Sequence, residues 1–64
     1  MVDKDIKTFA ELIFNQFGPT ADLEALKRAR QFNYLGDERN AEAWLMITDK
    51  VRELQNYGDA GRVG

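Results

Sequence analysis

Apolar residues recur at helical spacing in three segments of the chain, and short polar breaks separate the segments. The first of them predicts a helix over residues 5–17, with apolar positions three or four residues apart: Ile6, Phe9, Ala10, Ile13 and Phe17. Asp3 or Asp5 is expected to cap its start, because a short carboxylate accepts hydrogen bonds from the free amides of a first turn. The pair Gly18-Pro19 is expected to end it.

The second segment predicts a helix over residues 21–35, with Thr20 as its cap and Gly36 as its stop. Its distinguishing feature is a row of alanines four residues apart, made of Ala21, Ala25 and Ala29. Such a row lies on one face of a helix. It is expected to let a neighbouring helix approach closely.

The third segment predicts a helix over residues 38–57, with Asp37 as its N-cap. Its apolar arc covers about half of the helix surface and consists of Ala41, Trp44, Leu45, Ile47, Thr48, Val51 and Leu54. Residues 58–64 show no apolar period and are expected to form a flexible tail.

These elements predict a small all-α fold, a three-helix domain over residues 1–57. The connections are only two or three residues long, so the helices over 21–35 and 38–57 are expected to form an antiparallel hairpin with the helix over 5–17 packed across it. No alternating run rich in Val, Ile or Thr indicates a strand.

Four apolar residues lie outside the predicted core stripes and are candidates for contact with a protein partner: Leu12, Phe14, Tyr34 and Met46. Leu12 and Phe14 occupy opposite margins of the apolar arc over residues 5–17, which spans roughly 200°. An arc this wide either is flanked by two helices or leaves apolar surface for a partner. Trp44 fits the core or a partner anchor, and its central place in its arc favours the core.

Composition argues against an enzyme. The 64-residue chain contains no Cys, His or Ser, so the usual nucleophiles, general bases and zinc ligands are missing. No Asp-x-Asp-x-Asp-Gly calcium loop is present either. A chain of this size is also expected to lack a pocket of several hundred Å³. We therefore expect no catalytic residue, no metal, no cofactor and no small-molecule substrate.

Nine basic and eleven acidic residues give a net charge of −2, which lacks the positive balance of a free-standing nucleic-acid binder. A basic cluster near residues 35–37 nevertheless leaves a nucleic-acid-associated regulator as the alternative function; it consists of Lys27, Arg28, Arg30 and Arg39. Glu38 and Glu42 would meet phosphate at the start of the following helix. Neither a secretory leader nor a bilayer-spanning run is evident, so we expect no membrane partner and a cytoplasmic protein.

Two resemblances follow from the turn at Leu35-Gly36-Asp37. With Ala29, Ala41 and Leu45 it resembles the turn inside one tetratricopeptide-type repeat. More widely, residues 17–54 resemble a family of short uncharacterised bacterial three-helix proteins, through Gly18, Ala21, Ala25, Ala29, Gly36, Asp37, Trp44, Ile47, Val51 and Leu54. The sequence departs where that family often has His (Phe17 here) and Gly (Asn40 here).

The family has no assigned activity, so the resemblance implies a fold and no function. The wide apolar arc, the small core and the missing catalytic groups favour a non-enzymatic protein-interaction module. Its expected partner is another protein or a second copy of the chain, bound through the apolar surface of the helix over 5–17.

Overall fold

The computed structural model describes the backbone of residues 3–63 and the side chains of residues 5–56, and this part of the chain is helical throughout apart from one turn. The elements are α1 (Asp3–Phe17), a short 3₁₀ helix η1 (Gly18–Thr20), α2 (Ala21–Tyr34) and α3 (Glu38–Val63). No strand occurs in the described residues. The all-α prediction is confirmed.

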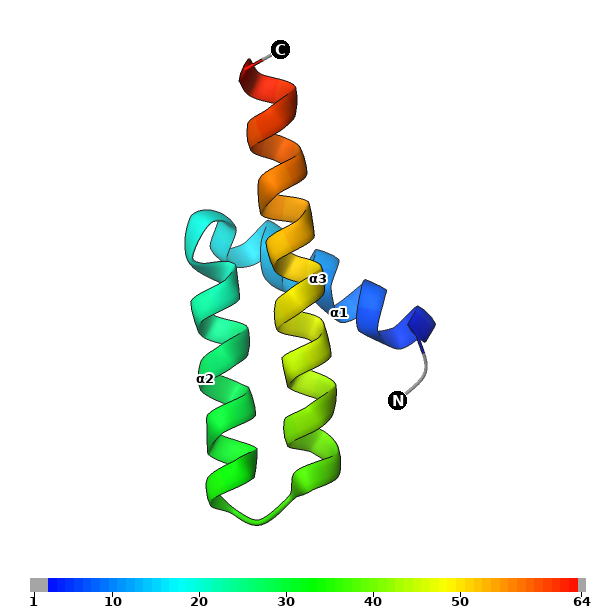
Figure 1. The fold of residues 1–64 in the computed structure, drawn as a ribbon, viewed down its shortest axis with the longest axis vertical. Coiled ribbons are helices and arrows are strands. Elements are labelled where there is room, and N and C mark those ends of the chain that lie inside the picture. The colour runs from blue at the N-terminus through cyan, green and yellow to red at the C-terminus, as the bar shows by residue number, and fades with distance from the viewer. Residues whose placement is uncertain (1–2, 64) are drawn as a thin grey trace.

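The helices form an elongated body of 43 × 21 × 15 Å. Figure 1 shows α2 and α3 side by side, running in opposite directions and joined by the turn at the foot of the view. α1 crosses behind α3, and η1 leads from its end into the upper end of α2. α3 extends beyond this crossing point.

Three helix boundaries differ from the sequence-based prediction. α1 begins at Asp3, so Asp3 and Asp5 both lie inside the helix and neither is its N-cap. α2 ends at Tyr34, one residue before the predicted end at residue 35. α3 continues to Val63, past the predicted end at residue 57. A glycine inside a helix lowers its stability by about 1 kcal/mol without breaking the hydrogen-bond ladder, which is why Gly58 alone is a weak stop. The predicted flexibility of residues 58–64 falls outside the residues whose side chains the structure describes.

Two glycines end helices as predicted. Gly18 after α1 has φ +56° and Gly36 after α2 has φ +81°, the left-handed region that other residues enter at a cost. At the second site the Asp37 amide donates to the Phe32 carbonyl at 2.9 Å and the Gly36 amide donates to the Asn33 carbonyl at 3.1 Å. This pair of bonds is a Schellman motif, which satisfies the last carbonyls of α2.

The two predicted caps behave differently. Asp37 caps α3, since its Oδ1 accepts from the Asn40 amide at 3.2 Å and its Oδ2 accepts from the Asn40 side chain at 2.7 Å. Thr20 precedes α2, but its side chain makes no cap bond; its hydroxyl donates back to the Phe17 carbonyl at 3.2 Å. η1 directly precedes α2, and its Gly18 carbonyl accepts from the Ala21 amide.

The charge on Asp37 makes this cap sensitive to pH. Hydrogen bonds from the side chain and then the backbone of Asn40 hold the pKa of Asp37 below its ordinary value of 3.8. A carboxylate whose pKa is lower in the folded state than in the unfolded state stabilises the fold at any pH above its unfolded-state pKa. This stabilisation is lost as the pH falls through the folded-state pKa. We expect wild type to be more stable than Asp37→Asn at pH 7 and to lose that advantage below about pH 4. Thermal unfolding from pH 7 to pH 2 measures this, and a constant difference would contradict it.

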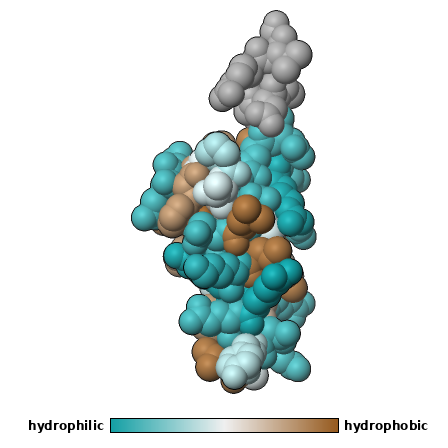
Figure 2. All heavy atoms as spheres, turned by 90° about the vertical axis from the view of Figure 1, so that its left-hand side faces the viewer, coloured by the Kyte–Doolittle hydropathy of each residue, from teal (hydrophilic) through white to brown (hydrophobic). Residues whose placement is uncertain are grey.

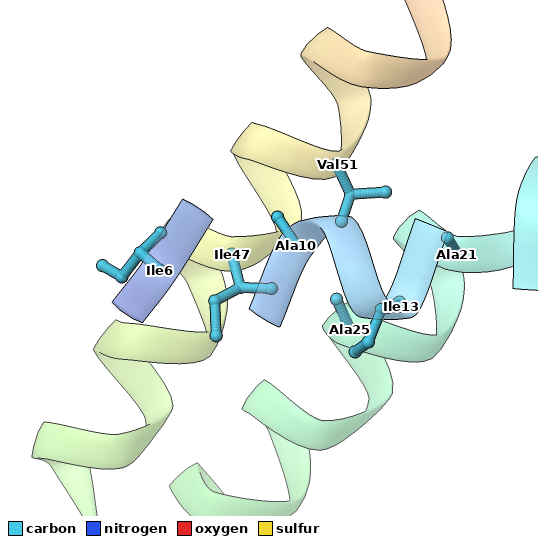
Figure 3. Packing of buried hydrophobic residues seen from close by; sticks show 7 residues of the cluster. All are labelled: Ile6, Ala10, Ile13, Ala21, Ala25, Ile47 and Val51. Carbon is cyan, nitrogen blue, oxygen red and sulfur yellow. The ribbon is translucent and has the colours of Figure 1, made fainter. Parts of the chain in front are cut away.

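The core lies where the three helices meet, and it is built largely from alanine. Figure 3 shows Ile13 beside Ala25 of α2, and Ala10 beside Ile47 and Val51 of α3. Of the ten buried apolar residues in the described part of the chain, six are alanines. The one buried polar residue in the described part, Thr48, donates its hydroxyl to the Trp44 carbonyl at 2.8 Å. Short side chains bring the helix axes close together and bury little area per residue.

Larger apolar side chains consequently lie at the margins of this core. Those that pack against it remain only partly buried, and they are Phe14, Phe17, Trp44 and Leu54. Phe9 and Leu45, which we expected on buried faces, are 41% and 48% exposed. These two predictions were wrong because helices in close contact along small residues cover only a narrow stripe of each other.

Candidate interaction surface

One side of α1 carries exposed apolar residues next to each other. Leu12 is 57% exposed and Phe9, three residues earlier, is 41% exposed. Asp5 and Gln16 are exposed on the same side, because successive spacings of four, three and four residues keep positions on one helix face. We call Asp5, Phe9, Leu12 and Gln16 the α1 strip. It lies about 100° around the helix from the buried stripe of Ile6, Ala10 and Ile13.

The two predicted contact residues of this helix lie in different environments. Leu12 belongs to the α1 strip, while Phe14, on the opposite margin, is half-buried against the core. α1 contacts both α2 and α3, yet these contacts leave the Leu12 side uncovered. Sequence reasoning missed Phe9 as part of this surface. The neighbouring Ala10, which allows a close helix contact and therefore a narrow one, is the signal that could have indicated it.

An aromatic and cationic cluster adjoins the α1 strip. The rings of Phe9 and Trp44 lie 6.2 Å apart between centroids at 51°. The Arg28 guanidinium lies 5.5 Å from the Trp44 ring and 6.0 Å from the Phe17 ring, within the range of a cation–π interaction. Trp44 is thus half-buried between all three helices. Its packing against the core agrees with the interpretation that the sequence favoured.

The basic residues proposed for nucleic-acid binding lie in different surroundings. Arg28 faces the aromatic cluster, and its guanidinium also lies 3.5 Å from the Glu24 carboxylate. Lys27 and Arg30 are exposed on α2, and Arg39 is exposed in the first turn of α3. The Asp37 carboxylate, whose pKa is lowered, keeps a negative charge close to Arg39. That charge opposes the approach of phosphate to the start of α3.

The two remaining candidate residues, Tyr34 and Met46, lie on different helices. Tyr34 is 91% exposed at the last position of α2, beside the turn. Met46 is 48% exposed and lines a hollow of about 490 Å³. The other lining residues come from α1 and α3, and they are Ile6, Asp49, Lys50 and Glu53.

The hollow corrects our expectation that a chain of this size lacks a pocket of several hundred Å³. It lies beside the place where α1 crosses α3, and residues of both helices line it. The Lys50 ammonium lies 3.2 Å from the Glu53 carboxylate at its rim. These groups pair with each other in a setting open to solvent, so the hollow lacks the convergent buried polar groups of a small-molecule site.

On the α2 side of the molecule, apolar surface is scattered. Figure 2 shows separate apolar spots in the middle of this side and at its lower end, with polar surface between them. Leu23 and Leu35 of this region are 61% and 68% exposed. Single exposed apolar residues are ordinary on protein surfaces. The α1 strip differs because its two apolar members are neighbours on one helix face and adjoin Trp44.

A side-chain network holds α1 in place relative to the α2–α3 pair. Gln55 of α3 donates to the carbonyls of Gly18 and Pro19 at 3.1 and 3.2 Å, and to the Asp22 carboxylate at 3.2 Å. The Arg52 guanidinium lies 3.7 Å from the same Asp22 carboxylate. Because η1 directly follows α1, these bonds hold the C-terminal end of α1 against α3. Sequence analysis missed this network, since the bonded residues are thirty or more positions apart.

The described residues provide no further reactive arrangement. They contain no group of three or more acidic, His or Cys residues placed to hold a metal ion. Their buried side-chain nitrogen and oxygen atoms all have hydrogen-bond partners. Among the helices of the described part, none combines the length and apolar character needed to cross a bilayer.

A comparison of the chain with protein-family models, curated proteins and solved structures gives no match. The resemblances to a tetratricopeptide-type turn and to short bacterial three-helix proteins therefore stay predictions.

Proposed function

We propose that this chain is a non-enzymatic protein-interaction module, a three-helix domain that binds a protein through the α1 strip. α2 and α3 form its antiparallel hairpin and α1 provides the contact face. The observation that carries the proposal is the adjacent exposure of Phe9 and Leu12 on α1, beside a stripe whose buried members, among the described side chains, are Ile6, Ala10 and Ile13.

Burial of these two side chains supplies a favourable free energy for association. Fully burying a Leu or Phe side chain contributes about 1.5–3 kcal/mol, and roughly half of each remains exposed here. Covering both therefore contributes a few kcal/mol by the same relation, before the entropy cost of association. Trp44, half-buried beside Phe9, extends the apolar contact, and aromatic residues are frequent anchors of protein interfaces.

A photoreactive amino acid at position 12 tests this function in the natural host cell. We expect covalent adducts of defined mass from position 12 and at most one-tenth of that yield from position 23. Leu23 is the matched control, because it is a leucine of similar exposure (61% against 57%) on another helix. Adding Phe9→Lys should abolish the adduct at position 12, since a charge cannot enter an apolar contact without a large desolvation cost. Equal yields from both positions, or none from position 12, would contradict the proposed function.

A further inference from the structure

We propose that the protein bound by the α1 strip is a second copy of this chain, with the two α1 helices antiparallel. This inference rests on the function proposed above and specifies its partner. It places Phe9 of each copy against Leu12 of the other, about a two-fold axis that passes between residues 10 and 11.

The spacing of the α1 strip is that of a helix pair. Its members are separated by four, three and four residues. The a and d positions of a coiled coil show the same alternation of three-residue and four-residue steps. Asp5 and Leu12 then occupy d positions, and Phe9 and Gln16 occupy a positions. All four are exposed in the single chain, so the contact requires no rearrangement of the core.

The order of residue types along the α1 strip is the same in both directions. It reads polar, apolar, apolar, polar, from Asp5 through Phe9 and Leu12 to Gln16. A two-fold symmetric interface brings the same patch of both subunits together, so the patch must be complementary to itself. In an antiparallel pair the apolar residues meet at the centre and the polar residues meet at the two ends. This symmetry favours a second copy over an unrelated helix.

Charge selects the antiparallel orientation. A parallel pair would place the Asp5 carboxylates of the two copies side by side, and like charges at such positions are unfavourable. An antiparallel pair places Asp5 opposite Gln16, whose amide can donate a hydrogen bond to a carboxylate.

The composition of the core gives the second copy a structural role. Among residues 5–56 of this 64-residue chain, six of the ten buried apolar residues are alanines, so the core covers little apolar area by itself. Small domains without disulfides or metals commonly gain stability by oligomerisation. Burial of the α1 strip in a symmetric pair adds two phenylalanine and two leucine side chains to the apolar contacts.

The lack of cysteine makes a disulfide test direct. The variants Asp5→Cys and Gln16→Cys, carrying tags of different mass, are oxidised separately and as an equimolar mixture of the full chains. We expect the covalent heterodimer in the mixture, at least tenfold above any homodimer. In the antiparallel register the two positions face each other, whereas identical positions lie about 16 Å apart along the helix axis, beyond the reach of a disulfide.

Two controls accompany this test. A mixture of Leu23→Cys with Gln16→Cys should give at most one-tenth of the heterodimer, because position 23 lies on α2. Adding Leu12→Lys to both cysteine variants should lower the heterodimer yield at least tenfold, whereas adding Leu23→Lys should leave it unchanged.

The outcomes separate the two proposals. A homodimer from Asp5→Cys alone would show a parallel pair and overturn the antiparallel arrangement. A monomer in sedimentation at about 100 µM together with no heterodimer in the disulfide test would overturn self-pairing. If position 12 still formed adducts with another protein in cells, the proposed function would stand without this partner. Absence of both results would overturn both proposals.

Discussion

Replacing Ile47 by alanine is expected to lower the free energy of unfolding by about 2–5 kcal/mol. Ile47 is fully buried, with 0% exposure, and belongs to the cluster in which α1, α2 and α3 meet. Truncation removes three buried carbon atoms and leaves a cavity between helices that cannot close further. A 64-residue domain has a total stability of roughly 3–10 kcal/mol, so this single change removes a large part of it.

Urea unfolding followed by helical circular dichroism measures the effect of Ile47→Ala. All variants are compared at one protein concentration, because association would add to the apparent stability. Leu23→Ala, which truncates an exposed side chain, is the matched control and should change stability by about 0.5 kcal/mol or less. Similar losses in both variants would show that the described core does not hold the helices together.

Replacing Ala25 by leucine is expected to destabilise the domain by about 1–3 kcal/mol or more, although it adds apolar volume. Ala25 has 0% exposure and lies in the row of small residues on α2 that faces Ile13 of α1. A larger side chain can fit there only if α1 or α3 moves away, and either movement opens the contacts of the whole cluster. The close packing of protein interiors leaves no other space for the added atoms.

The matched control for this variant is Lys27→Leu, which adds a leucine at an exposed position of the same helix. Its effect should stay within about 0.5 kcal/mol. Thermal and urea unfolding, run under the same conditions for both variants, measure the change in unfolding free energy of each. An unchanged or raised stability in Ala25→Leu would mean that α2 is not in close contact with its neighbours and that the alanine row has another role.

The α1 strip and the alanine core have a common physical origin. Ala10 and Ala25 allow the helices to approach, and close approach limits the width of the covered stripe on each helix. Phe9 and Leu12, to one side of that stripe on α1, remain outside it. A core with larger residues would hold the helices further apart and let the flanking side chains fold inward. We therefore expect the contact surface and the small core to depend on each other.

Helix type and most helix ends could be predicted from local sequence. The left-handed conformations of Gly18 and Gly36 and the cap formed by Asp37 depend on residues within one turn of each site. Periodicity likewise identified the alanine row as buried. The predicted end of α3 at residue 57 and the predicted cap bond of Thr20 were wrong. At each site the backbone can form more than one set of local hydrogen bonds, and the sequence does not show which set forms.

The candidate site was only partly accessible to sequence reasoning. The margin position of Leu12 indicated an exposed apolar residue, and its 57% exposure agrees with that indication. Phe9, which the sequence placed on the buried face, is exposed, and Phe14, proposed as a contact residue, is half-buried against the core. Periodicity gives the direction in which a side chain points, but not which neighbouring helix reaches it.

The sequence by itself determined that this protein is all-helical, where α2 ends and α3 begins, and that it contains no Cys, His or Ser. These properties follow from backbone preferences and from composition, which act within a few residues. Only the tertiary structure decided that Arg28 lies over Trp44 and Phe17, that Gln55 holds η1, and that Phe9 joins Leu12 at the surface. Each of these depends on the distance and angle between helices, which the packing of alanines from different segments sets.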